Sequence, residues 1–483
     1  MATTVTQAAP ISESVTRPQT SPWMSRALML ATDLVALTLA GFVGSQIWSH
    51  VNRGSPPIYR HFWPAIALFI LIFGTENLYP GVGVGPVELL RKLVRGVSVV
   101  YLMLTTVVFM TKGADYQSRG AFFTSWILSI LLLPLARAWV HQMAAKKPWF
   151  GVPVVILGSG ETAELLIEKL HQAPEMAMKP VACLDDFTDG RSEISGVPLI
   201  GDLALAKPLA RSLHIRHAIL AMPGLPGEQL VVLLEKLSVV FPHVFLVPNL
   251  MGVASIPVSP MDVGGVLALE LRHNLLFPIN RYLKRALDVV AVLVLMPLAI
   301  PITLICALCI YLVSRHNPFF LHAREGEGGK PIRILKLRSM YPDADAILER
   351  YLEENREARE EWERYCKLRR DPRVLPGVGH FLRRSSLDEL PQFWNILIGQ
   401  MSLVGPRPFP SYHMRQFPSA FRDLRVKVRP GLTGLWQISA RSEGDLEVQE
   451  VLDTYYIRNW SLWLDIFILS RTARAVFFGQ GAY

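Results

Sequence analysis

The stretch that decides the fold is KRALDVVAVLVLMPLAIPITLICALCIYLVS, residues 284–314. Its apolar run is long enough to cross the hydrocarbon core of a bilayer. Pro297 and Pro301 lie near its middle, where each removes a backbone donor and disfavours a straight helix. Basic residues flank the run on both sides, namely Arg281, Lys284, Arg285, Arg315 and Arg324.

Positive charge at both ends gives a crossing helix no preferred orientation, because basic flanks favour the cytoplasmic side. A helix that enters the membrane, breaks and returns leaves both ends on that side. We therefore expect a re-entrant helix pair at 284–314, broken at Pro297 and Pro301. The alternative is a kinked helix that spans the membrane.

The composition indicates a membrane protein with more than one domain. Of the 483 residues, 51% are hydrophobic and only 18% are charged, and the mean hydropathy is +0.30. Such a chain is too apolar for an ordinary soluble protein and too long for one domain. The net charge of +9 favours an anionic partner, which could be nucleic acid, a lipid surface or a phosphorylated substrate.

The N-terminal part predicts a disordered tail at 1–22 and a four-helix transmembrane region at 23–145. The expected crossings are four apolar segments, at about 24–48, 62–80, 96–111 and 120–138. Eight basic residues lie in the tail, in the loop after the second segment and after the fourth segment, against four in the other two loops. This difference places both ends of the bundle in the cytoplasm.

Residues 146–275 are expected to form a Rossmann-like α/β domain. PVVILGSGETAELLIEKL, residues 153–170, is typical of a strand, a glycine turn and a helix, with Gly158, Gly160 and Ala163 in dinucleotide-binding spacing. Asp185 and Asp186 end the next strand. A tight turn that packs helix on strand without a cofactor explains the glycines equally well. No tyrosine is followed four residues later by lysine, so epimerase or dehydrogenase proton transfer is not expected.

Cations and short motifs crowd the C-terminal part of the chain. GKPIRILKLRSM predicts a strand that carries Lys336 and Arg338, and a charged amphipathic helix is expected at about 343–370. The motifs that follow are RRSSLDELPQFWN, MSLVGPRP with Arg407, and RPGLTGLWQISAR with Gln437 and Arg441.

The adjacent carboxylates of Asp388 and Glu389 allow two interpretations. Ser386 to Glu389 matches a capping box at the start of a helix. Pro391 weakens that interpretation, because proline is best placed at the first position of a helix that starts near residue 391. The other interpretation is a catalytic site. Two adjacent carboxylates would take up a proton unless cations or a metal offset their repulsion, and the nearby arginines and lysine supply such cations.

The order of these motifs, over roughly 280–483, resembles the bacterial sugar transferases, also called monotopic phosphoglycosyl transferases. Within that family it is most similar to the undecaprenyl-phosphate galactose phosphotransferases. The resemblance implies a membrane bundle of four crossings, a Rossmann-like α/β domain, and a mixed, mainly α catalytic domain at 280–483 on a re-entrant membrane helix. It also implies the bacterial inner membrane, with the soluble domains in the cytoplasm.

The implied reaction transfers a hexose-1-phosphate, expected to be galactose-1-phosphate, from a UDP-sugar to undecaprenyl phosphate and releases UMP. This step initiates O-antigen, capsule or exopolysaccharide synthesis. The partners would be UDP-galactose or UDP-glucose, undecaprenyl phosphate, membrane lipids and a second copy of the chain, but no nucleic acid. The alternatives are the same reaction with UDP-glucose, or a membrane-anchored NAD-dependent nucleotide-sugar enzyme.

The resemblance also assigns roles to residues of this chain. Asp388 would be the nucleophile that forms a covalent sugar-phosphate intermediate, and Glu389 would hold the required Mg²⁺. Arg383 would handle phosphate and Arg407 would lie near the nucleotide. The other candidates for binding phosphate or nucleotide are Lys336, Arg338, Gln437 and Arg441.

The chain departs from the family pattern in four places. His322-Ala323-Arg324-Glu325-Gly326 stands where the family commonly has Gln-x-Arg-Val-Gly, Ala440 replaces a glycine before Arg441, and Ile300 precedes Pro301 where the family has serine. Gln400 replaces an aspartate, so a metal or hydrogen-bonding role at that position is in doubt.

Overall fold

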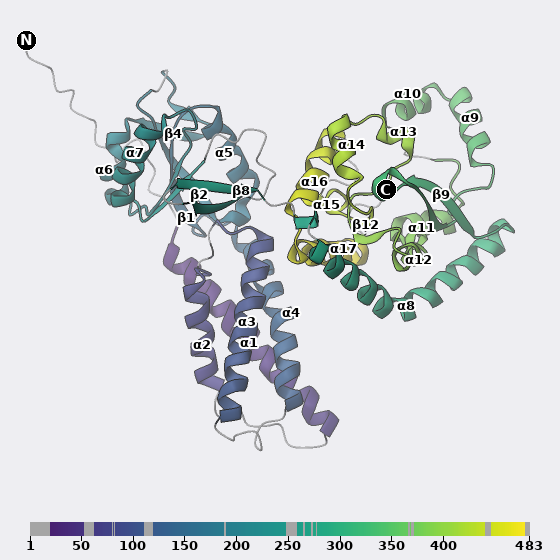
Figure 1. Ribbon diagram of the computed structural model, residues 1–483, viewed down its shortest axis with the longest axis horizontal. Coiled ribbons are helices and arrows are strands. Elements are labelled where there is room, and N and C mark those ends of the chain that lie inside the picture. The colour runs from purple at the N-terminus through teal and green to yellow at the C-terminus, as the bar shows by residue number, and fades with distance from the viewer. Residues whose placement is uncertain are drawn as a thin grey trace, which may run out of the picture. The chain divides into compact units, whose positions relative to one another are not determined.

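The computed structural model describes most of the chain, in two compact units at residues 1–250 and 251–483 (Figure 1). The described residues are 20–52, 62–79, 81, 83–110, 119–187, 190–247, 258–263, 266–271, 274–276, 278–365, 368, 371–439 and 446–478. Residues 1–19 of the expected disordered tail lie outside them.

The first unit begins with a bundle of four helices (Figure 1). They are α1 (Pro22–Asn52), α2 (Phe62–Thr75), α3 (Pro86–Met110) and α4 (Arg119–Ala144). Phe73, Val97 and Leu133 are fully buried in the core of the bundle. Apolar side chains that face away from this core, such as Val35 and Leu135, are more than 60% exposed, as expected of helices that meet lipid rather than water.

A buried ion pair joins the first and last helices of this bundle. Arg137 of α4 donates from Nε to Oδ1 of Asp33 at 2.7 Å and from Nη1 to the Leu78 carbonyl at 3.0 Å. Tyr79 donates its hydroxyl to the same Asp33 carboxylate. Both charges are almost fully buried, and each is tolerated because the other compensates it.

Three helices in the described part of the chain are long and apolar enough to cross a membrane: Pro22–Val51, Arg119–Ala144 and Pro278–Ser314. The first two correspond to the first and fourth expected crossings. The 14 residues of α2 span only about 21 Å, and the first half of α3 carries Glu88, Arg91, Lys92 and Arg95. The four crossings of the N-terminal region therefore stay a prediction.

A six-stranded sheet follows the bundle, in the order β3-β4-β2-β1-β5-β6. All neighbours pair in parallel except β3 and β4. The strands are β1 (Val152–Leu157), β2 (Met178–Leu184), β3 (Glu193–Ile194), β4 (Val197–Gly201), β5 (His217–Leu220) and β6 (His243–Leu246). The helices are α5 (Glu161–Gln172), α6 (Ala206–Ser212) and α7 (Gly227–Val240), with 3₁₀ turns η2 (Pro174–Met176) and η3 (Leu203–Leu205).

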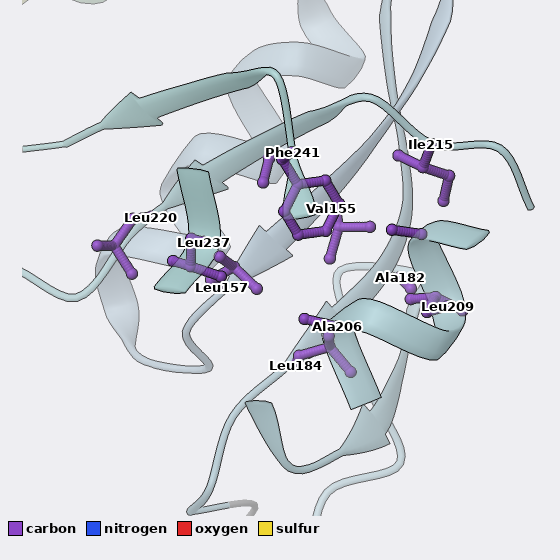
Figure 2. Packing of buried hydrophobic residues seen from close by; sticks show 12 residues of the cluster. Val155, Leu157, Ala182, Leu184, Ala206, Leu209, Ile215, Leu220, Leu237 and Phe241 are labelled. Carbon is purple, nitrogen blue, oxygen red and sulfur yellow. The ribbon is translucent and has the colours of Figure 1, made fainter. Parts of the chain in front are cut away.

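The alternation of side chains along β1 builds a core on each face of this sheet. Val155 and Leu157 face α6 and α7, where Leu209, Leu237 and Phe241 are buried (Figure 2). The other residues of the strand pack with Ala163 and Ile167 of α5. Because every residue of β1 is buried, the strand is apolar throughout, as in other doubly wound sheets. The Rossmann-like prediction is confirmed in this respect.

The second unit is mainly helical, with three small two-stranded sheets. Its strands are β7 (Val258–Val263), β8 (Val266–Leu271), β9 (Phe319–Glu325), β10 (Pro331–Leu337), β11 (Ser402–Val404) and β12 (Gly431–Thr433). Its helices are α8 (Pro278–Ser314), α9 (Ala344–Glu354), α10 (Arg356–Tyr365), α11 (Val378–Ser385), α12 (Gln392–Leu397), α13 (Ser411–Met414), α14 (Ser419–Arg425), α15 (Leu435–Ser439), α16 (Leu446–Asn459) and α17 (Leu462–Phe478). Short 3₁₀ turns are η4 (Asn274–Leu276), η5 (Glu327–Gly329) and η6 (Leu387–Glu389).

One expected helix is divided in two. A single helix at about 343–370 was predicted, but the backbone turns extended at Asn355 between α9 and α10. The Asn355 side chain donates to the Tyr351 carbonyl, so it closes the first helix, as asparagine commonly does at helix ends.

The long apolar helix α8 is continuous, with Pro297 and Pro301 inside it. The expected break at these prolines is therefore wrong: α8 is one helix, which bends without an interruption (Figure 1). A straight helix of its 37 residues would extend about 55 Å. The bend follows from the two prolines, whose rings clash with the preceding turn.

Both ends of α8 pack on the same body of the second unit. At the N-terminal end, Lys284 Nζ pairs with Asp465 of α17 at 2.7 Å, and the Asp288 carboxylate accepts bonds from the Ser402 hydroxyl and the Leu403 N–H. At the other end, Ile310 is buried against Leu337 and neighbouring apolar residues. The apolar residues between these ends are largely exposed, so the bend carries the apolar surface away from the body while both ends remain on it.

Candidate active site

Asp388 and Glu389 lie on the 3₁₀ turn η6, between α11 and α12. Ser386 has φ +56° and ends α11 in the left-handed conformation, and its side chain makes no capping hydrogen bond. The capping-box interpretation is therefore wrong. Pro391 immediately precedes α12, which agrees with a helix starting near residue 391. Leu387 packs against the apolar cluster at the C-terminal end of α8, so the acidic pair is seated against the membrane helix.

Two cations hold Glu389. Its Oε1 accepts a hydrogen bond from Lys336 Nζ at 2.7 Å and one from Arg407 Nη2 at 3.3 Å. Burial alone would raise the pKa of Glu389, but Lys336 and Arg407 outweigh it and lower the pKa to about 2. Glu389 is therefore ionised at any physiological pH. The negative charge of Glu389 is balanced by these two cations, so it does not repel an anionic substrate as an isolated carboxylate would.

Asp388 has a different environment from its neighbour. Among the described residues its carboxylate has no hydrogen-bond or ion-pair partner, and the residue is only partly exposed. Burial raises the pKa of Asp388 to about 6, and Glu389 adds to the shift, while Lys336, Arg383 and Arg407 oppose it. At neutral pH the carboxylate is therefore mostly ionised and, within the described ranges, has no partner, which is the state a nucleophile requires.

Arg383 is close to the acidic pair but also contacts another carboxylate. Its Nη1 lies 3.9 Å from Asp371 Oδ2. Asp371 also binds the Arg373 guanidinium through two bonds of 2.8 and 2.7 Å. Asp371 is therefore bound mainly to Arg373 and makes only a long ion contact with Arg383.

The other predicted binding residues are not all brought to the pair. Arg338 lies one residue beyond β10, donates from Nε to the Asn317 carbonyl and covers the Phe320 ring. Gln437 is buried and its amide donates to the carbonyl of Leu432, in β12. Arg441 and Ala440 lie outside the described residues.

Two further residues shape the site without having been predicted there. Burial and the neighbouring Arg407 lower the pKa of Arg324 to about 10, and Glu389 contributes in the opposite direction, so Arg324 is a further cation close to the pair. Arg425 is buried, pairs with Asp453 at 3.3 Å and donates to the Arg407 carbonyl. It thereby fixes the Pro-Arg-Pro turn, beside a small open recess lined in part by Arg407 and Phe409.

Asn395 fastens the strand that carries Lys336 to the helix that follows the acidic pair. It accepts from the Leu335 N–H at 2.9 Å and donates to the Arg333 carbonyl at 2.7 Å. Its amide also donates to Gln400 Oε1 at 2.7 Å. Gln400 therefore has a hydrogen-bonding role, as the acceptor that holds the Asn395 amide. Ala323 is an exposed residue of β9 paired with Arg333, and nothing in the structure explains that substitution.

The residues present fit a magnesium ion that also binds substrate phosphates. No group of three histidine, cysteine or acidic side chains with metal-site geometry occurs in the described part of the chain. Mg²⁺ is commonly held by only one or two carboxylates plus phosphate oxygens. The Asp388 carboxylate and Oε2 of Glu389 have no partner among the described residues, so acidic oxygens remain for such an ion.

The glycine turn of the Rossmann-like domain is closed by its own aspartate. Gly158 has φ +125°, and a Cβ there would lie 2.7 Å from the Ala221 carbonyl oxygen, so the turn needs glycine. Asp185 Oδ2 accepts from the Ser159 N–H and hydroxyl, each at 2.7 Å. In a dinucleotide site the turn faces the pyrophosphate and the acidic residue binds the ribose. Their mutual bonding here favours the tight-turn interpretation.

Comparisons with known proteins identify the family of the chain. A family model described as bacterial sugar transferase matches residues 279–479, and one described as CoA-binding domain matches residues 79–248. The UDP-galactose-lipid carrier transferase of Erwinia amylovora and the undecaprenyl-phosphate galactose phosphotransferase of Salmonella typhimurium are each 34% identical over 378 residues, covering 76% of this chain and 76% of the relative. The UDP-glucose:undecaprenyl-phosphate glucose-1-phosphate transferase of Escherichia coli is 32% identical over 68% of each chain. The predicted enzyme class is confirmed: the chain belongs to the bacterial sugar transferase family.

Proposed function

We propose that this phosphoglycosyl transferase moves a hexose-1-phosphate from a UDP-sugar to undecaprenyl phosphate and releases UMP, as the first step of polysaccharide synthesis. The observation that carries the proposal is the different environment of the two adjacent carboxylates on η6. Asp388 has no partner in the described part of the chain, while Glu389 is held by Lys336 and Arg407. A nucleophilic carboxylate surrounded by cations suits attack on a diphosphate, which is itself anionic.

In the first step, an Oδ of Asp388 attacks the phosphorus that is bonded to the sugar. The new O–P bond forms as the bond from that phosphorus to the bridging diphosphate oxygen breaks, and UMP leaves with the electron pair. Lys336, Arg407 and Arg324 offset the charge that builds on the phosphate oxygens. Arg383, whose charge also acts on Asp388, would bind the transferred phosphate.

In the second step, a phosphate oxygen of undecaprenyl phosphate attacks the same phosphorus. The O–P bond to Asp388 breaks, its carboxylate is restored, and the lipid carries the sugar in a new diphosphate. Two displacements in sequence predict ping-pong kinetics. The seating of Leu387 against α8 supports this step, because it keeps the nucleophile next to the helix that would meet the lipid.

We assign Mg²⁺ to Glu389, together with phosphate oxygens of the donor. When bound, the ion would neutralise diphosphate charge and favour departure of UMP. Galactose is the proposed sugar, because two of the similar relatives are named for galactose. Glucose is the second candidate, because another similar relative is named for glucose. The homodimer stays a prediction.

We also propose that α8 is re-entrant and that both soluble parts are cytoplasmic, in the bacterial inner membrane. The support is that both ends of α8 pack on one body, through Lys284 and Asp288 at one end and Ile310 at the other. A helix that spanned the membrane would separate these ends by the bilayer thickness.

The direct test is UMP release by the purified chain in nanodiscs with undecaprenyl phosphate and a panel of UDP-sugars. We expect the highest kcat/KM with UDP-galactose. Asp388→Asn should lower the rate by about 10³-fold or more, because the amide cannot attack phosphorus. Asp423→Asn, at an exposed position of α14, is the matched control and should leave the rate unchanged. Wild-type UMP release by Asp388→Asn would refute the mechanism.

The metal assignment predicts that Glu389→Gln weakens the apparent affinity for Mg²⁺ by about 10–100-fold. The loss of rate should be partly relieved when Mg²⁺ is raised. Glu360→Gln, at an exposed position of α10, removes the same charge and should leave the Mg²⁺ dependence unchanged. A Mg²⁺ titration of UMP release measures both, and an unaltered titration for Glu389→Gln would contradict the assignment.

The charge state of Asp388 predicts a pH profile. Asp388 must be ionised to attack, so the rate should fall as pH drops through about 6 and level off above it. Because Lys336 lowers the pKa of Asp388, Lys336→Met should move the midpoint to higher pH. Lys330→Met, at an exposed position, should not move it. A midpoint that shifts downward in Lys336→Met would show that the titrating group is not Asp388.

The re-entrant topology predicts that both ends of α8 react on the same side of the membrane. Single cysteines at Tyr282 and His316, both exposed, are introduced into a background in which the native cysteines are serine. A membrane-impermeant maleimide should label both only in inverted vesicles. Labelling of the two positions from opposite sides would establish a spanning helix instead.

A further inference from the structure

A second cavity lies in the same unit, at the N-terminal end of α8. It has a volume of about 460 Å³, part of it open to solvent. Five basic side chains line it, three from the start of α8 and two from the segment before β12: Arg281, Lys284, Arg285, Lys427 and Arg429. None of Lys336, Asp388, Glu389 or Arg407 is among its lining residues, so the cavity is distinct from the active site.

The cations of this cavity are not all neutralised. Lys284 pairs with Asp465 at 2.7 Å, and Arg281 and Arg429 share the single carboxylate of Glu327.

The two remaining cations have no carboxylate partner among the described residues. Arg285 donates to the backbone carbonyls of Ile396 and Leu397, and Lys427 makes no ion pair with an acidic side chain in the described part of the chain. The acidic lining residue Asp288 is bound by neutral donors, the Ser402 hydroxyl and the Leu403 N–H. The five cations are thus matched by only three carboxylates, those of Asp465, Glu327 and Asp288. This leaves two positive charges in the recess, on side chains that are also hydrogen-bond donors. Such a recess suits a phosphate group.

The same turns of α8 also present an apolar surface. Leu283, Leu287 and Val290 share one face of the helix, turned away from the cavity, and are 47%, 38% and 58% exposed. The cavity therefore lies at the end of a helix whose exposed face suits acyl chains. Basic pockets beside membrane helices on the cytoplasmic side suit anionic headgroups, so a lipid phosphate fits this position better than free phosphate does.

We propose that this cavity binds the headgroup phosphate of an anionic phospholipid. The bound lipid would secure the N-terminal end of α8 at the membrane surface, beside the strand and helix that carry the active site. Binding does not depend on the proposed reaction, because it requires neither the UDP-sugar nor Asp388.

The test measures lipid retention by the purified full chain with native mass spectrometry, after reconstitution in phosphatidylcholine with or without phosphatidylglycerol. We expect retained phosphatidylglycerol in the wild type, and about 10–30-fold weaker retention in Lys427→Gln/Arg429→Gln. The control Arg356→Gln/Arg359→Gln removes two exposed charges from α10 and should retain the lipid as the wild type does.

A variant of opposite sign separates lost binding from lost folding. Glu327→Gln frees Arg281 and Arg429 from their shared partner and should strengthen retention, which a misfolded cavity would not do. Unchanged retention in Lys427→Gln/Arg429→Gln would overturn the proposal. So would displacement of the lipid by millimolar inorganic phosphate, or retention of undecaprenyl phosphate in place of phosphatidylglycerol, since either would assign the cavity to a different ligand.

Discussion

The bond of 2.7 Å between Lys336 and Glu389 gives two adjacent carboxylates different chemistry. With its charge taken up by Lys336 and Arg407, Glu389 is ionised and fixed in place. Asp388 remains without a partner among the described residues, and its pKa of about 6 leaves it mostly charged at neutral pH. If both carboxylates were held equally, neither would be free to attack. If neither were held, their mutual repulsion would favour protonation of one of them.

The position of Lys336 is itself secured from a distance. Asn395 joins β10, which carries Lys336, to α12, which follows the acidic pair. The membrane helix α8 then packs against the same assembly at both of its ends. The acidic pair, its cations and the apolar helix are therefore parts of one packed unit. A lipid phosphate approaching along α8 would arrive at a site whose charges are already arranged.

The motifs of the sequence located most of this site, because the acidic pair, Lys336 and Arg407 each lie in a distinctive local pattern. Other features had no such local signal. Asn395 and Arg425 act through contacts with residues far away along the chain, so their roles appear only once the fold brings those residues together. Arg338 shares the strand periodicity of Lys336, but β10 ends at Leu337 and the side chain turns to Asn317.

The fold likewise has features that local sequence patterns predict and features that depend on packing. The doubly wound sheet followed from apolar runs and a glycine turn, and long apolar helices from hydropathy. The prolines of α8 predicted a break, whereas the helix tolerates them by bending. Ser386 matched a capping box in sequence, yet it ends the preceding helix instead. A local sequence pattern indicates which backbone conformation is favoured, and the packing of neighbouring elements determines which conformation forms.

The central claim is that Asp388 carries the sugar phosphate between donor and acceptor. Its most direct measurement is the mass of the peptide that contains residue 388, after the protein reacts with UDP-galactose and Mg²⁺ without acceptor and is quenched in acid. The account predicts an added hexose phosphate on Asp388, which disappears when undecaprenyl phosphate is supplied before the quench. An unmodified Asp388 in protein that turns over normally with both substrates would contradict it.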